Sequence, residues 1–269
     1  MQNTLTLYAT MAAIGFYLGT AAYLYSQIRS KQSIKQNPWL IALTLLPIIL
    51  HFFSVQHTLF HPHGIQLDLF NATSLILLVI NLLIVISGIK KPLHTLFVFL
   101  FPLSALLLLT GTISPIQTTT DNSVNNEILT HALLSILAYS LFIIATLQAV
   151  LLAYQNHQIK NKNPNGFISA LPPLQTMEAL LFELLWFGEI LLTIAILTGF
   201  VFVEDVFAQQ LVHKTVFTLM AWVIYAVLLW GRHIRGWRGN TALRLTLGGF
   251  CFLMLAYFGS KFVLEVLLQ

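Results

Sequence analysis

Four of the thirteen residues in the segment HFFSVQHTLFHPH are histidine, a side chain that binds zinc, copper and haem iron. They are His51, His57, His61 and His63. The spacing of His57 and His61 places both on one face of a helix, but the proline and glycine that follow favour a helix end. No third ligand at zinc-site spacing and no HExxH motif is present. We therefore interpret His51 as a candidate ligand and the other three as part of a polar loop.

The composition indicates where these histidines lie. The chain has 269 residues, of which 57% are hydrophobic and 8% charged, and its mean hydropathy is +0.82. Soluble domains carry about 25% charged residues, so this chain is predicted to be a polytopic membrane protein with an all-α fold. Cys251 is the single cysteine, which excludes an internal disulfide, a CxxC pair and a CxxCH haem-attachment site.

Eight apolar segments are long enough to cross a membrane, since a spanning helix needs about 20 mostly apolar residues. Their short connections predict one transmembrane helical bundle, and hence a single membrane domain, over residues 1–269. The predicted spans lie near 4–28, 37–58, 68–88, 92–112, 128–155, 181–204, 214–231 and 244–267.

The basic residues predict the orientation of the bundle. Eleven of the thirteen lysines and arginines fall in alternate loops, and Lys214 and Lys261 are the exceptions. Cytoplasmic loops carry the excess of positive charge in membrane proteins, so we assign these loops to the cytoplasm and both termini to the outer, periplasmic side. The net charge of +4 follows from this topology and does not indicate a nucleic-acid partner.

Three histidines fall at similar depth in this topology. His51 lies about seven residues below the outer end of the second span, or about 10 Å at 1.5 Å per residue. His131 lies in the first turn of the fifth span, and His213 precedes the seventh. We expect these three side chains to converge in or just above the outer leaflet. For His51 an interhelical hydrogen-bonding role remains the alternative to ligation.

Polar residues inside the sixth span offer a different chemistry. Glu183 and Glu189 lie in its inner half, and buried carboxylates in membranes usually face the bundle interior or a water path. They predict a polar path for protons or cations, although Glu183 also suits the inner interface. We interpret Asn71, Asn81 and Gln148 as interhelical hydrogen-bonding residues.

Several segments carry a resemblance to a known family. AWVIYAVLLWGRHIRGWRG (221–239) and LAYFGSKFVLEVLL (255–268) resemble the C-terminal part of the CcsA/CcmC/HemX cytochrome c assembly family. THALLSILAYSLFIIATLQAVLLAYQ (130–155) and LHFFSVQ with LDLFNATSLI (50–76) resemble two of its histidine-containing regions. The segments PPL (172–174) and GFVF (199–202) are similar to the YpjD/HemX-like branch of small inner-membrane proteins.

The resemblance implies roles for two histidines. His131 matches the family's external histidine, and His51 matches its first intramembrane histidine. The chain departs from the family elsewhere: the loop VEDVFAQQLVHK (203–214) lacks the tryptophan-rich WWD segment, and the second intramembrane histidine, expected near Trp230, is absent. The implied cofactor is haem b, with His51 and His131 as iron ligands and His213 as a third candidate.

A b-type haem also needs an apolar slot and partners for its propionates. Trp222 is a candidate slot residue, with ordinary packing as the alternative. Lys261 is a candidate propionate partner, with extension to the membrane interface or pairing with Glu265 as alternatives.

The resulting prediction is a haem-binding or haem-handling protein of the bacterial inner membrane, with an accessory role in cytochrome c biogenesis or haem homeostasis. Its expected partners are haem, the lipid bilayer and other cytochrome c assembly or membrane proteins. We expect no enzymatic activity, because no nucleophile–base pair and no P-loop is recognisable. The alternative function is a transport or ion-efflux accessory that uses the same fold without haem.

Overall fold

The computed structural model describes residues 2–30, 38–61, 64–65, 69–88, 94–113, 126–162, 168, 171–202 and 209–259. Within these ranges the chain forms eight α-helices, and the all-α prediction is confirmed. The helices are α1 (Gln2–Arg29), α2 (Pro38–Leu59), α3 (Leu69–Gly88), α4 (Phe97–Ile113), α5 (Asn126–Lys160), α6 (Leu174–Phe202), α7 (Gln209–Arg235) and α8 (Asn240–Met254).

Short elements join or extend these helices. A 3₁₀ turn, η1 (His94–Leu96), precedes α4, and a π-helical turn, η3 (Leu255–Gly259), continues α8. The two-residue strands β1 (Phe60–His61) and β2 (Gly64–Ile65) pair antiparallel directly after α2. These strands are too short to change the helical character of the fold.

Seven of the described helices are long and apolar enough to cross a membrane, so the chain is a multi-span membrane protein. The remaining predicted span, 92–112, corresponds to a shorter apolar helix at Phe97–Gly111. The 17 residues of α4 extend about 26 Å at 1.5 Å per residue, slightly less than the hydrocarbon core of about 30 Å.

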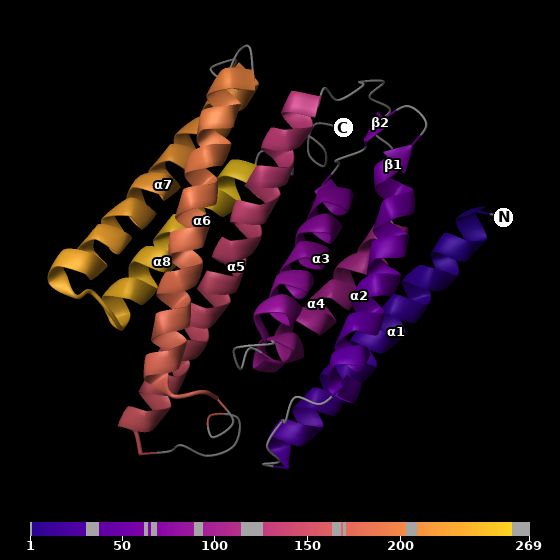
Figure 1. Cartoon of the computed structure of the whole chain (residues 1–269), viewed down its shortest axis with the longest axis horizontal. Helices are drawn as coiled ribbons and strands as arrows, with labels where there is room; N and C mark the ends of the chain where they lie inside the picture. Colours follow the sequence, from indigo (N-terminus) through magenta and orange to yellow (C-terminus); the bar gives the residue numbers. More distant parts are fainter. Residues whose placement is uncertain are drawn as a thin grey trace. The chain divides into compact units, whose positions relative to one another are not determined.

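The chain divides into two compact units. The N-terminal unit comprises Met1–Ser123 with Pro164–Leu171, and the C-terminal unit comprises Val124–Asn163 with Pro172–Gln269. In the N-terminal unit each of α1 to α4 packs against the next, and α4 packs back against α1. In the C-terminal unit α5 to α8 are connected in the same cyclic order (Figure 1). Each unit is therefore a four-helix arrangement with its own interior.

Pro47 interrupts the hydrogen bonds of α2, and α1 compensates. Proline has no N–H, so the carbonyl of Leu43, four residues earlier, loses its helical donor. The Thr20 hydroxyl of α1 donates to this carbonyl at 3.2 Å. A helix can carry a proline in a membrane when a neighbouring side chain satisfies the released carbonyl in this way.

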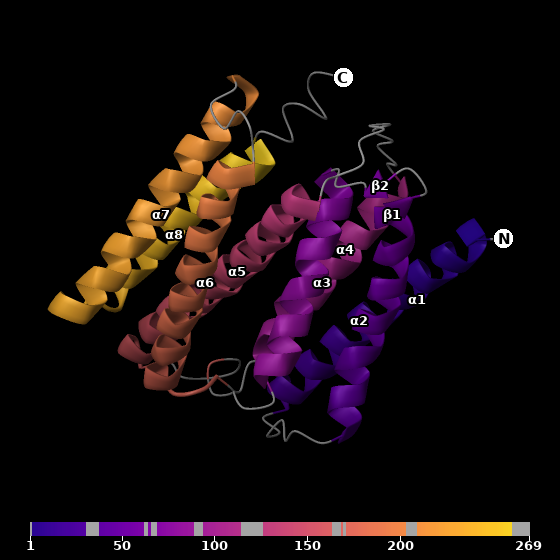
Figure 2. The ribbon, with the colours of Figure 1, turned by 45° about the horizontal axis from the view of Figure 1, so that its top comes forward.

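Stacked rings between two glycines form the interior of the C-terminal unit. The rings of Phe142 (α5) and Tyr225 (α7) stack at 4.0 Å between centroids and 14° between planes. Gly188 (α6) faces Phe142, and Gly249 (α8) faces Tyr225, so closely that an added Cβ would meet the rings at 3.1 and 2.7 Å. Each of the four helices, which Figure 2 shows running alongside one another, thus contributes one residue.

Candidate functional site

The N-terminal unit contains His51 at its centre. Its side chain is fully buried, and both ring nitrogens have partners. Nδ1 lies 3.0 Å from the Tyr17 hydroxyl of α1, and Nε2 lies 2.8 Å from the Ser74 hydroxyl of α3. The imidazole therefore joins three helices by hydrogen bonds.

Asn81 extends this network to the fourth helix. Its Nδ2 donates to the Ser104 hydroxyl of α4 at 2.8 Å and approaches the Tyr17 oxygen at 3.4 Å. If Asn81 donates to Tyr17, the tyrosine proton goes to Nδ1 of His51, and Nε2 then carries the proton that Ser74 accepts. This arrangement leaves His51 without a free lone pair. The interhelical roles predicted for Asn81 and for Gln148, which donates to the Met177 carbonyl at 3.2 Å, are confirmed.

The imidazole of His131, on α5, is held through one ring nitrogen, unlike that of His51. Its Nδ1 lies 2.9 Å from the Ala195 carbonyl and 3.2 Å from the Thr198 hydroxyl, both on α6. A carbonyl only accepts, so Nδ1 carries the proton in the neutral ring and Nε2 carries the lone pair. Among the residues that the structure describes, no group bonds Nε2 of His131, and the side chain is half-buried.

Gly199 allows His131 to lie directly against α6. A Cβ at this position would meet Cε1 of the imidazole at 3.0 Å and Nδ1 at 3.4 Å, but Nε2 only at 3.8 Å. The Nδ1–Cε1 edge of the ring therefore lies nearest to α6, and Nε2 lies farther from Gly199. Gly199 opens the GFVF segment, whose contact with His131 is not evident from the sequence.

The donor set of His131 fits a haem or metal ligand. Ligating histidines usually donate their second N–H to a carboxylate or a main-chain carbonyl, which fixes the tautomer and the ring orientation. His131 has such a bond, whereas Nε2 of His51 is engaged with Ser74. The two histidines lie in different units, and their expected convergence remains a prediction.

The other residues predicted for the haem site differ in their exposure and in their contacts. His213 is exposed on α7. Trp222 donates from Nε1 to the Thr193 hydroxyl of α6 at 2.9 Å, so it joins α6 to α7. Lys261 lies outside the described residues, as do His63 and the side chains of the other two loop histidines. No group of three or more His, Cys, Asp or Glu side chains arranged to hold a metal ion occurs within the described ranges.

The two glutamates of α6 have different surroundings. Glu183 is exposed, as expected for a residue at the interface. Glu189 is 7% exposed, and neither of its carboxyl oxygens has a hydrogen-bond partner in the part of the chain that the structure describes. The polar path predicted from both residues therefore depends on Glu189.

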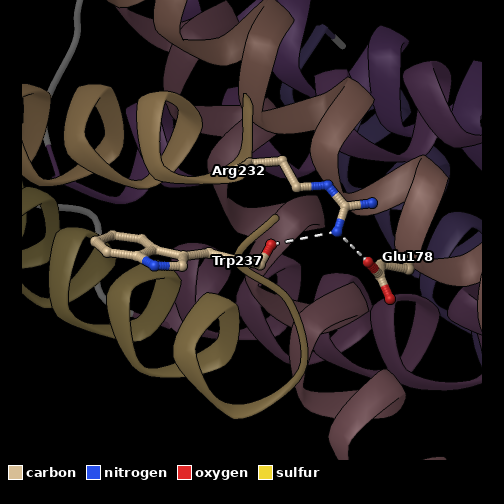
Figure 3. A network of polar contacts seen from close by, with 3 residues as sticks. All are labelled: Glu178, Arg232 and Trp237. Atoms are coloured by element: carbon tan, nitrogen blue, oxygen red, sulfur yellow. Dashed lines mark hydrogen bonds and ion pairs between the residues drawn. The ribbon is translucent and has the colours of Figure 1, made fainter. Parts of the chain in front are cut away.

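An ion pair that the sequence does not reveal joins α6 to α7. The Arg232 guanidinium donates to Glu178 and to the Trp237 carbonyl (Figure 3). It also lies 4.4 Å from the centre of the Phe182 ring. The sequence places Arg232 in a basic cytoplasmic loop but does not specify a partner. The sequence feature that could have indicated this ion pair is Glu178, an acidic residue near the beginning of an apolar segment.

Glycines shape the turn that Arg232 holds. Gly236 has a φ of 65°, a left-handed conformation that ends α7, and its N–H donates to the Arg232 carbonyl at 3.2 Å. Gly231 leaves room for the Trp237 indole, which an added Cβ would overlap. Gly231 near the end of α7 and Trp237 of the GWRG segment (236–239) therefore pack together at this turn.

Comparison with known proteins identifies the family. The family model described as cytochrome c assembly protein matches residues 42–268. The chain belongs to the cytochrome c assembly protein family. The match includes His51, His131 and the turn at Arg232, and it extends over both units.

Individual relatives agree with this family assignment. Inner membrane protein YpjD of Escherichia coli (strain K12) is 32% identical over 204 residues, which cover 76% of this chain and 77% of the relative. The cytochrome c biogenesis protein CcsA of Chlamydomonas reinhardtii is 25% identical over 145 residues, or 52% of this chain and 39% of the relative. CcsA of Guillardia theta is 26% identical over 158 residues, or 52% of each chain. No solved structure matches the chain.

Proposed function

We propose that this cytochrome c assembly protein binds haem b at His131 and has an accessory, non-catalytic role in cytochrome c biogenesis or haem homeostasis. Two of its relatives carry the name cytochrome c biogenesis protein CcsA, which supports the biological context. The observation that carries the proposal is the Nε2 of His131, which no described residue bonds, together with an Nδ1 that donates to a main-chain carbonyl.

The chemistry of this histidine suits haem. His131 would hold the haem through the lone pair of its neutral imidazole, and the haem would supply the iron that this lone pair binds. The bond from Nδ1 to the Ala195 carbonyl keeps the proton on the side of the ring that faces α6. The hydroxyl of Thr198, 3.2 Å from Nδ1, restrains the same edge. His131 is thus prepared as a ligand without any change of tautomer.

Other predicted residues have secondary roles in the proposal. His213, exposed at the beginning of α7, is the candidate for a second axial ligand. Lys261 is retained as a propionate partner from the sequence alone. His51 would become a ligand only if the Ser74 hydroxyl left its Nε2 and the proton moved to Nδ1, so we assign it a structural role.

The proposed location is the bacterial inner membrane, with both termini on the periplasmic side. The name of the E. coli relative YpjD, inner membrane protein, supports this location. The proposed partners are haem, the lipid bilayer and other cytochrome c assembly or membrane proteins.

The test is a haemin titration of the purified full-length chain in detergent, followed by absorption and a pyridine haemochrome assay. We expect wild type to give a b-type spectrum near one haem per chain and His131→Ala to lose most of it. His157→Ala is the control, because His157 is an exposed histidine on the same helix and bonds Asn161. A wild-type chain that binds no haem, or a His131→Ala variant that binds it normally, would refute the proposal.

A further inference from the structure

The carboxyl group of Glu189 has no role in the proposed haem site. It lies inside the C-terminal unit on α6, next to Gly188, against which the Phe142 ring packs. The residue is more than nine-tenths buried, and both carboxyl oxygens lack a hydrogen-bond partner among the described residues. An unpartnered polar group in such an interior is costly and usually functional.

Among the residues that the structure describes, the cations of the C-terminal unit lie toward the helix ends, away from this carboxyl. Arg232 is bound to Glu178, which precedes Glu189 by eleven residues, or about 16 Å along α6. Lys214 on α7 lies eleven residues before Tyr225, again about 16 Å along its helix. The lysines at the end of α5 and the arginines at the beginning of α8 are exposed.

Other titratable groups packed around α6 are neutral. His131 of α5 contacts α6 at Ala195, six residues or about 9 Å beyond Glu189, with its donor directed to a carbonyl. Tyr225 of α7 is within electrostatic range of Glu189, as well as of Tyr139 on α5 and Cys251 on α8. None of these groups supplies a positive charge to balance a carboxylate.

A second unsatisfied group lies in the same interior. The Thr246 hydroxyl of α8 is fully buried and has no hydrogen-bond partner among the described residues. The Tyr225 hydroxyl, which is in electrostatic range of Glu189, donates to the Thr246 carbonyl at 3.4 Å. The interior of this unit therefore holds an unpartnered carboxyl on α6 and an unpartnered hydroxyl on α8 among the described residues.

We propose that Glu189 is a proton-binding site within the C-terminal unit, which holds its carboxyl as the neutral acid and exchanges the proton with solvent. Removing an isolated carboxylate from water without a partner costs far more than burying the acid, so the folded chain favours the protonated form. Thr246 and Tyr225 are uncharged residues of the same unit and would not oppose this neutral form. This inference goes beyond the proposed function and needs no haem.

Infrared spectroscopy of the haem-free chain in lipid nanodiscs tests the protonation state. We expect a carboxylic acid C=O band at neutral pH that shifts in D₂O, disappears in Glu189→Gln and remains in Glu183→Gln. Glu183 is the matched control, because it lies on the same helix but is exposed. The proposal would be overturned if Glu189→Gln lost only carboxylate bands. It would also be overturned if this variant kept the acid band.

Carbodiimide labelling provides a second measurement that needs no variant, in case Glu189→Gln does not fold. Dicyclohexylcarbodiimide adds to protonated carboxyl groups in apolar surroundings, and peptide mass spectrometry locates the adduct. We expect labelling at Glu189 that decreases as the pH is raised. An acid band that persists at high pH, together with an unlabelled Glu189, would overturn the exchange of the proton.

Discussion

The interior of the N-terminal unit is built from hydrogen-bonding side chains, whereas that of the C-terminal unit is built from stacked rings between glycines. In the first, His51 bonds Tyr17 and Ser74 across three helices. In the second, Phe142 and Tyr225 stack between close helix backbones. The first interior occupies both ring nitrogens of His51, while the second leaves His131 at its margin with an Nε2 that no described residue bonds. Burial of a histidine in a membrane is therefore weaker evidence for ligation than the state of its second nitrogen.

The largest expected effect comes from removing His51. His51→Ala leaves the Tyr17 and Ser74 hydroxyls without their partner and opens a cavity, so we expect the free energy of unfolding to fall by about 3 kcal/mol. Thermal unfolding in detergent, followed by circular dichroism, measures this. His157→Ala should leave stability unchanged. Equal stability of the two variants would show that the polar network contributes nothing.

Closer helix packing is tested at Gly249. A Cβ there would meet the Tyr225 ring at 2.7 Å, and overpacking of this kind costs about 1–3 kcal/mol, so Gly249→Ala should lower the melting temperature. Gly248, its neighbour, has no atom within 4 Å of an added Cβ. Gly248→Ala should therefore be neutral or slightly stabilising. If both variants behave alike, the glycine does not serve the aromatic stack.

Each unit has a fully buried tyrosine, Tyr17 in the first and Tyr225 in the second, so that removing each hydroxyl compares the two interiors. The Tyr17 hydroxyl contacts His51 at 3.0 Å and Asn81 at 3.4 Å, whereas the Tyr225 hydroxyl has one bond at 3.4 Å to a carbonyl. Tyr17→Phe should cost about 1–2 kcal/mol in unfolding free energy, and Tyr225→Phe less than about 0.5 kcal/mol. Chemical denaturation of both variants in mixed micelles gives the two values. The reverse order would contradict the contrast between the interiors.

The smallest effect is expected at the ion pair. The side chains of Arg232 and Glu178 are 33% and 20% exposed, so solvent screens their attraction, and Glu178→Gln should cost at most about 1 kcal/mol. Because Arg232 also bonds the Trp237 carbonyl, we expect a change in tryptophan fluorescence with little change in melting temperature. A loss of several kcal/mol would mean that the turn at Trp237 is essential for the whole unit.

Much of the fold could be predicted from the sequence, because apolar length and the exclusion of charges are local properties. The interhelical role of Asn81 could also be predicted, since an amide in a membrane needs a partner. The hydrogen-bond partners of His51 and Asn81 could not be predicted in this way. Tyr17 and Ser104 are far from His51 along the chain, and nothing local indicates that their helices meet around it.

The sequence predicts which histidines are candidate ligands, but it does not predict the tautomer or the hydrogen bonds of each one. The sequence places His51 and His131 at similar depth, and the resemblance gives both a ligand role. Only the contacts separate them, because the tautomer of an imidazole depends on what its other nitrogen meets. Gly199 was visible as part of a family-like segment, but its close approach to His131 depends on how α5 and α6 pack.

The most direct test of the account is the absorption spectrum of haem-loaded His131→Gly, recorded with and without added imidazole, beside His51→Asn. The account predicts that His131→Gly loses the b-type spectrum and regains it when free imidazole replaces the missing side chain, while His51→Asn retains it per folded chain. A normal spectrum in His131→Gly, or a loss in His51→Asn that imidazole restores, would show that the buried histidine is the ligand.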